Sequence, residues 1–144
     1  MSLIEQRHPK LGQLLRVWQS HCHGDGLPSA RALVSDAFSD LAPSTVLLRP
    51  TDNAGDRLTI ATSGAEVDAL YGESLAGAPV ERLAPLRGDA AMEAKSAIET
   101  ARPVVIEDEL RIGNGRRRVA RLYLPLANAD GSADGVLCGI VAVS

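Results

Sequence analysis

Residues 103–143 constrain the fold more than any other part of the chain. They contain three β-rich runs, PVVIEDELRI, RRRVARLYLPLA and VLCGIVAV, which are separated by the turn-forming clusters GNG and NADGSADG. Asn114-Gly115 is a strong hairpin signal, because a type I′ turn needs positive φ at both central positions. The sequence therefore predicts three consecutive antiparallel strands, and an apolar face of such a sheet must be covered by helices.

The last of these strands is apolar on both faces. One face carries Val136, Cys138, Ile140 and Ala142, and the other carries Leu137, Gly139, Val141 and Val143. On the preceding strand Leu122, Leu124 and Leu126 oppose Arg121 and Tyr123. A sheet with apolar residues on both sides needs two covers, so we expect small helices on one face and an amphipathic helix or a second subunit on the other.

The amphipathic helix is predicted over residues 9–23, with Pro9 in its first turn and Gly24 at its end. Its apolar stripe consists of Leu11, Leu14, Leu15, Trp18 and Cys22 at helical spacing. We expect Leu11, Leu14, Leu15 and Trp18 to pack on the outer face of the sheet and to take part in a homodimer.

A second, shorter helix and a hairpin are predicted next. The helix is indicated by Leu33, Val34, Ala37, Phe38 and Leu41 at helical spacing, and it ends before Pro43. STVLLRP and RLTIAT then read as two strands joined by the turn TDNAGD.

Two further helices precede the final strands. Ser63 and Glu66 have the spacing of a capping box at the start of a short helix that Gly72 ends. An irregular crossing is expected over residues 75–85, followed by a longer helix over residues 86–101 and a strand that begins at Pro103.

Length, composition and charge limit the function. A chain of 144 residues that is 45% hydrophobic suits one domain, residues 1–144, with a leader helix over 9–23 and a core over 44–143. A net charge of −3 argues against nucleic acid or an anionic membrane as partner. Two cysteines far apart in sequence, without a membrane-length apolar run or a signal peptide, predict a cytoplasmic protein.

The order of these elements resembles that of PAS domains, and several short motifs match a short, stand-alone bacterial PAS subfamily. The matching pieces are Trp18, Gly26-Leu27-Pro28-Ser29, Ser63-Gly64, Leu70-Tyr71-Gly72-Glu73-Ser74-Leu75-Ala76-Gly77, Pro103-Val104-Val105, Leu124-Pro125-Leu126 and Asp130-Gly131. The resemblance covers most of the chain from Leu11 to Val143. One departure is Ala30, which stands where this subfamily usually has arginine directly after Pro-Ser.

The resemblance implies an α+β fold with a five-stranded antiparallel sheet, helices on one face and the N-terminal amphipathic helix on the other. It also implies a non-catalytic sensory or protein-interaction module in bacterial signalling, which holds a small molecule or a partner segment against the sheet and forms a homodimer. Ligand-pocket candidates between sheet and helices are Tyr71, Ile98, Leu122, Leu124 and Cys138. The identity of a ligand or of a signalling partner does not follow from the fold.

No cofactor or metal is predicted. Flavin photoreceptors of this family use a cysteine in an Asn-Cys-Arg-Phe type motif, and neither Cys22 nor Cys138 lies in one. Haem-binding members use a histidine on the helix before the meander, whereas His8, His21 and His23 all precede the sheet. His21-Cys22-His23 with Asp25 would suit a metal, but neighbouring helical residues point in different directions, so a structural role is favoured.

Two alternative functions remain open. Arg117, Arg118 and Arg121 form part of a basic run that would bind phosphate or a cyclic nucleotide, although arginines on a strand more often keep a sheet edge solvated. A small α+β enzyme would use a carboxylate base such as Glu107, Asp108 or Glu109, which are otherwise exposed carboxylates of an extended strand.

Overall fold

The computed structural model describes residues 8–22, 26–29, 40–50, 57–84, 89–112, 115–127 and 133–143. Its elements in chain order are α2 (Pro9–Ser20), η1 (Ala42–Ser44), β1 (Thr45–Pro50), β2 (Leu58–Ser63), α4 (Ala65–Tyr71), η2 (Val80–Leu83), α5 (Ala90–Thr100), β3 (Val104–Ile112), β4 (Gly115–Ala127) and β5 (Ala133–Ala142). The five strands form one antiparallel sheet in the order β2-β1-β5-β4-β3. The predicted meander and the predicted first hairpin are both confirmed.

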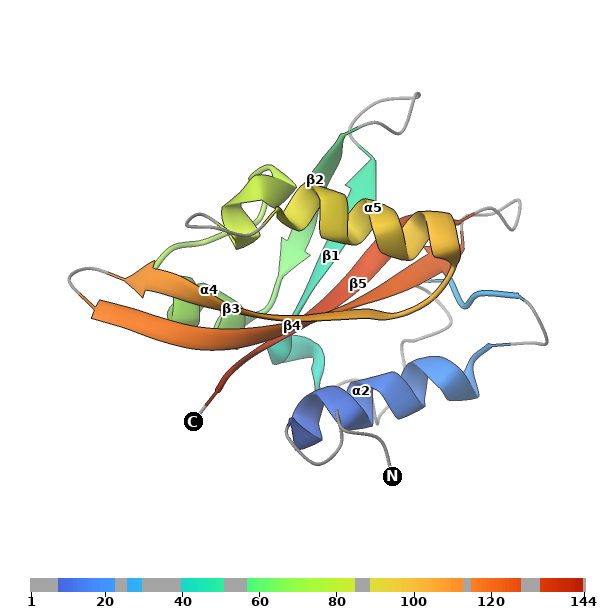
Figure 1. Cartoon of the computed structure of the whole chain (residues 1–144), viewed down its shortest axis with the longest axis horizontal. Helices are drawn as coiled ribbons and strands as arrows, with labels where there is room; N and C mark the ends of the chain where they lie inside the picture. Colours follow the sequence, from blue (N-terminus) through green and yellow to red (C-terminus); the bar gives the residue numbers. More distant parts are fainter. Residues whose placement is uncertain are drawn as a thin grey trace.

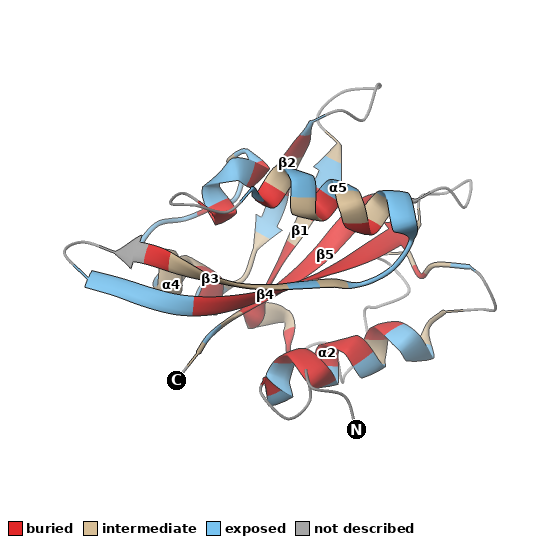
Figure 2. Ribbon diagram, viewed as in Figure 1, coloured by how far each residue is buried: buried red, intermediate tan, exposed pale blue. Residues whose placement is uncertain are grey.

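The sheet is covered on both faces (Figure 1). We call inner the face on which α4, η2 and α5 lie, and outer the face on which α2 lies. Figure 2 shows buried residues along the middle of the sheet and on the sides of α2 and α5 that face it. The predicted α+β architecture, with an amphipathic N-terminal helix opposite the other helices, is therefore confirmed.

The outer layer is an apolar contact between α2 and the two longest strands. Leu11, Leu14, Leu15 and Trp18 pack with Ala120, Leu122, Leu124, Leu126 and Leu137. The Trp18 indole Nε1 also donates to the Pro125 carbonyl of β4 over 2.9 Å. Gly139 of β5 permits this close approach, because an added Cβ would lie 2.5 Å from Leu14 Cδ2 and 2.9 Å from Leu11 Cδ2.

Two helix boundaries differ from the prediction. Helix α2 ends at Ser20, before the predicted residue 23, because the Ser20 hydroxyl and the His21 Nδ1 both bond to the Val17 carbonyl and compete with a further helical turn. Helix α5 begins at Ala90, where the Asp89 carboxylate accepts from the Met92 amide. Residues 85–88, 23–25 and 30–39 lie outside the described residues, and with them most of the predicted second helix and His23 and Asp25.

The predicted capping box at Ser63 and Glu66 is wrong. Ser63 is the last residue of β2, and its hydroxyl donates to Asp68 Oδ1 over 2.7 Å. Glu66 instead accepts from Ser44 Oγ and from Lys10 Nζ. The reason is that Gly64, not Ser63, takes the extended N-cap conformation. Gly72 ends α4 with φ 74°, as predicted.

Candidate functional site: a buried arginine cluster

Arg121 lies in the middle of β4 on the inner face and is fully buried, with no exposed surface. Its side chain directs four donors at four different groups. Nε donates to the Tyr123 hydroxyl over 3.0 Å, and Nη1 donates to the Leu83 carbonyl over 3.3 Å. Nη2 donates to Glu93 Oε1 over 3.0 Å and to Asp108 Oδ2 over 3.2 Å. Each of the three guanidinium nitrogens therefore has a hydrogen-bond partner.

The partners of Arg121 come from different elements. Asp108 of β3 is opposite Val119 of β4, so it is the diagonal neighbour of Arg121 on the same face of the sheet. Glu93 lies in the first turn of α5, and Leu83 is the last residue of η2. Arg121 therefore connects the sheet to the two elements that cover its centre.

Two tyrosines extend the cluster. The Tyr123 hydroxyl donates to Glu93 Oε1 over 2.6 Å while it accepts from Arg121. The Tyr71 hydroxyl, at the end of α4, donates to the Leu83 carbonyl over 2.6 Å. Every buried side-chain nitrogen and oxygen in the described part of the chain has a hydrogen-bond partner. The cluster is therefore internally satisfied, which is the condition under which buried polar groups are tolerated.

Burial and charge fix the protonation of this cluster. Burial alone lowers the pKa of Arg121, but Tyr123 and Glu93 beside it outweigh burial and raise that pKa above its usual value. Burial raises the pKa of Tyr71, Tyr123 and Cys138 well above their usual values. At neutral pH the interior therefore holds a charged guanidinium, neutral phenols and a neutral thiol.

The predicted pocket residues do not all lie on one face. Cys138 belongs to the inner core, and Tyr71 and Ile98 pack against that core. Leu122 and Leu124 belong to the outer cluster beneath α2. The prediction that these two leucines lie between the sheet and the inner helices is wrong. Strand alternation puts Arg121 and Tyr123 on the inner face and the leucines on the outer face.

The predicted arginine site is not assembled. Arg117 and Arg118 are exposed and point to opposite faces of β4, whereas Arg121 is buried. The interpretation of these arginines as solvated strand residues therefore holds for Arg117 and Arg118 and is wrong for Arg121. The three side chains do not converge on one phosphate-sized position.

The predicted carboxylates also differ from expectation. Glu107 and Asp108 do lie on opposite faces of β3, but Asp108 is only 13% exposed and pairs with Arg121. Glu107 Oε1 lies 3.1 Å from Nε2 of His8, which is buried at the start of α2. An arginine within an apolar strand is a signal that could have pointed to the pair of Asp108 and Arg121, but the partner carboxylate follows only from the strand register. The contact of His8 had no local signal.

The described residues contain no group of three metal-ligating side chains. His23 and Asp25 of the predicted His-Cys-His-Asp run lie outside the described residues. Cys22, just after α2, donates its Sγ–H to the Trp18 carbonyl. Among the described helices, none is long and apolar enough to span a membrane.

The sequence matches no family model and no curated protein. Its structure, in contrast, is similar to those of PAS and light-oxygen-voltage (LOV) domains. A LOV domain described with a flavin analogue superposes with a TM-score of 0.57 at 15% identity, over 78% of this chain and 88% of the other.

Two further structures agree. The PAS domain of a Colwellia psychrerythraea protein superposes with a TM-score of 0.55 at 20% identity, over 74% of this chain and 92% of the other. The Aureochrome1 LOV domain, a blue-light photoreceptor, gives a TM-score of 0.55 at 15% identity, over 77% of this chain and 89% of the other. The chain therefore has the PAS fold, as the sequence motifs predicted.

Proposed function

We propose that this chain is a non-catalytic PAS-type sensory or protein-interaction module of bacterial signalling. The observation that carries the proposal is the Arg121 cluster, which links β3, β4, η2 and α5 through charged hydrogen bonds. Because a buried charge left without its partner costs several kcal/mol, η2 and α5 can shift only in a concerted step that also breaks these bonds. A signalling module needs an element with two discrete arrangements, and we propose the Arg121 cluster as that element.

A small molecule held between the sheet and the inner helices remains part of this proposal. It would contact Tyr71, Ile98 and Cys138, since these three residues belong to or pack against the inner core. Such a ligand would also meet the Arg121 cluster, whose hydrogen bonds it would have to replace. A polar ligand is therefore favoured over a purely apolar one.

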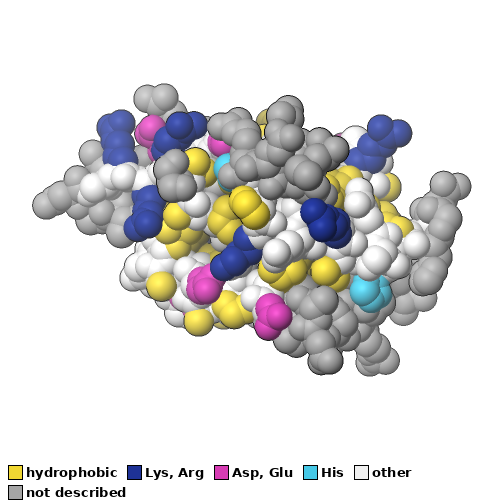
Figure 3. Space-filling view, turned by 90° about the horizontal axis from the view of Figure 1, so that it is seen from below, with side chains coloured by type: hydrophobic (Ala, Val, Ile, Leu, Met, Phe, Trp, Pro, Cys, Tyr) yellow, Lys and Arg dark blue, Asp and Glu magenta, His cyan; other side chains and the backbone are white. Residues whose placement is uncertain are grey.

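We also propose that the chain forms a homodimer, and the packing of α2 restricts the form of that dimer. The apolar stripe is already used within one protomer, where Leu11, Leu14 and Trp18 are at most 6% exposed. On the α2 side of the molecule, hydrophobic side chains are interspersed with basic and acidic ones (Figure 3). A dimer that exchanges α2 between two protomers keeps the same contacts, and we propose that form.

The enzyme alternative is less well supported by the described carboxylates. Asp108 is bonded to Arg121, and Glu107 is bonded to His8 and lies 4.0 Å from Arg118. A general base must be able to reach a substrate proton, and these groups already have partners.

The two free thiols, Cys22 and Cys138, support the reducing cytoplasm as the proposed location.

Native mass spectrometry and a turnover screen test the proposal together. A co-purifying small molecule that is lost when Ile98 is enlarged to tryptophan would support sensing at the inner face. A bare chain that forms a dimer would support protein interaction alone. Turnover of any substrate that disappears in a folded Asp108→Asn or Glu107→Gln protein would contradict the proposal.

A further inference from the structure

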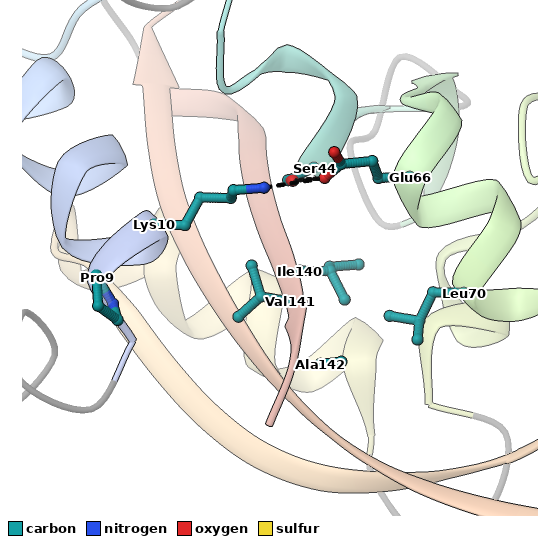
Figure 4. A pocket seen from close by; sticks show the side chains of 8 residues that line it. All are labelled: Pro9, Lys10, Ser44, Glu66, Leu70, Ile140, Val141 and Ala142. Carbon is teal, nitrogen blue, oxygen red and sulfur yellow. Dashed lines mark hydrogen bonds and ion pairs between the residues drawn. The ribbon is translucent and has the colours of Figure 1, made fainter. Parts of the chain in front are cut away.

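A second site lies at the end of the sheet, away from the Arg121 cluster. It is a pocket of about 370 Å³, a size at the lower end of the range for small-molecule sites. Pro9 and Lys10 at the start of α2 form one wall, and Glu66 and Leu70 of α4 form the other (Figure 4). Ser44, at the end of η1, closes the pocket between them.

The floor of the pocket is a piece of β5 that β1 leaves uncovered. The pairing of β1 with β5 ends at Thr45 and Gly139, so residues 140–142 extend beyond the first residue of β1. The amide of Val143 donates to the Arg118 carbonyl of β4. Because backbone groups alternate along a strand, the N–H and C=O of Ile140 and of Ala142 point away from β4, toward the side on which β1 has ended.

The polar side of the pocket is a pair of opposite charges. Lys10 Nζ and Ser44 Oγ both bond to Glu66 Oε2, over 3.0 Å and 2.6 Å. The hydrogen bond from Ser44, together with Lys10, lowers the pKa of Glu66, so this carboxylate is ionised at neutral pH. Lys10 and Glu66 are 44% and 58% exposed, which lets solvent and a ligand reach both charges.

This arrangement selects by charge. An anion attracted to Lys10 would be repelled by Glu66, and a cation attracted to Glu66 would be repelled by Lys10. A molecule that carries both charges on neighbouring atoms avoids both penalties. Its apolar part would rest on Leu70 and Val141, which line the pocket and are both partly exposed.

We propose that this pocket binds a free apolar α-amino acid. The carboxylate of the ligand faces Lys10, its ammonium faces Glu66, and its side chain covers Leu70 and Val141. The site bridges the outer helix α2 and the inner helix α4, so an occupant would join the two layers of the molecule. The inference concerns a site separate from the Arg121 cluster and does not depend on the function proposed above.

Two-dimensional ¹H–¹⁵N NMR titration with L-leucine, L-isoleucine, L-valine and L-methionine tests this inference. We expect saturable shifts confined to the amides of Lys10, Ser44, Glu66 and residues 140–142 for at least one of these amino acids. No saturable shift from any of them at up to about 10 mM would overturn the proposal, because weaker binding would be nonspecific. Shifts centred elsewhere would overturn it as well.

Ligand analogues and variants then test the charge argument for the best binder. The N-acetyl derivative lacks the ammonium and the amide derivative lacks the carboxylate, so each should bind about tenfold or more weakly. Lys10→Gln and Glu66→Gln should each weaken the binding of the amino acid by about the same factor. Lys95→Gln and Glu99→Gln, on the exposed side of α5, are the matched controls and should leave binding unchanged.

One combination separates recognition from a general loss of structure. In the Lys10→Gln protein the amide derivative, which is a cation, should bind at least as well as the amino acid itself. The repelling lysine is then absent, while Glu66 still accepts the ammonium. Equal weakening of all ligands by Lys10→Gln would contradict the assignment of Lys10 to the carboxylate.

Discussion

The two faces of the sheet are held in different ways. Among the described residues, α2 covers the outer face through apolar side chains, with a hydrogen bond from Trp18 to the Pro125 carbonyl and a contact of His8 with Glu107. The inner face carries a fully buried arginine whose bonds reach three other elements. Truncation of apolar side chains lowers the free energy of unfolding in steps that follow the volume removed. Removal of one partner of a buried ion pair instead leaves an unpaired buried charge, which is strongly destabilising. The outer face should therefore tolerate conservative substitutions better than the inner face.

The largest effect is expected for Arg121→Met. The substitution keeps much of the side-chain volume but leaves Glu93 and Asp108 without their cation, so it should destabilise the fold by about 3–5 kcal/mol. Urea unfolding followed by circular dichroism measures this difference. Arg118→Met, an exposed position on the same strand, is the control and should stay within about 0.5 kcal/mol. Equal costs for the two variants would remove the distinction between the faces.

Leu14→Ala should have the next largest effect. Leu14 is 2% exposed between α2 and the outer face, so its truncation leaves a cavity and should cost about 3 kcal/mol. The conservative Leu14→Met should cost below about 1.5 kcal/mol, because it conserves volume. The corresponding conservative change on the inner face, Arg121→Lys, should cost more than Leu14→Met, since an ammonium lacks the fork that bonds four partners. The reverse order in thermal unfolding would contradict the comparison.

Gly139→Ala tests the close approach of α2 at a single methyl group. The added Cβ would meet Leu11 and Leu14, and we expect a loss of about 1–3 kcal/mol as α2 is pushed outward. Gly135→Ala on the same strand is the matched control, because its Cβ would come no nearer than 3.4 Å to any described atom. An increase in the solvent exposure of Trp18, seen as a red shift of its fluorescence, should accompany Gly139→Ala only.

The smallest effect is expected where the two layers meet. Lys10 and Glu66 form an exposed ion pair between α2 and α4, so Glu66→Gln should change stability by about 0.5 kcal/mol or less at neutral pH. The pKa of Glu66 is lowered in the folded state. The ionised carboxylate therefore stabilises the fold above the usual glutamate pKa, and this stabilisation is lost as the pH falls through the pKa of Glu66 in the folded protein. The free energies of unfolding of the wild-type and Glu66→Gln proteins should therefore converge in acid. A difference that grows in acid would contradict this assignment.

Much of the fold followed from the sequence because its signals are local. The alternation in β5 and the stripe of α2 predicted a sheet covered on both faces, and both elements have the expected partners. The leucines of β4 were assigned to the wrong face, because Leu122 and Leu124 read as interior while Arg121 read as solvated. Alternation shows that these residues lie on opposite faces, but it does not show which face holds the ion pairs.

The candidate site was harder to predict than the fold. Asp108 and Arg121 become neighbours only once the register of β3 and β4 is known, and Glu93 joins them from a helix. The pocket between Lys10, Ser44 and Glu66 brings together three separate elements. No local pattern in a sequence encodes such a meeting, and the capping-box pattern that included Glu66 led to a different role for it.

The burial of Arg121 in an ion-paired cluster is tested most directly by ¹⁵N NMR of the arginine side chains. The guanidinium of Arg121 is held by Tyr123, Glu93 and Asp108 inside the folded protein. One guanidinium should therefore show an Nε–H protected from exchange with water and slow rotation about Nε–Cζ, and this signal should vanish in Arg121→Met. Arginine side chains that all exchange as fast as exposed Arg117 and Arg118 would contradict the burial and pairing of Arg121.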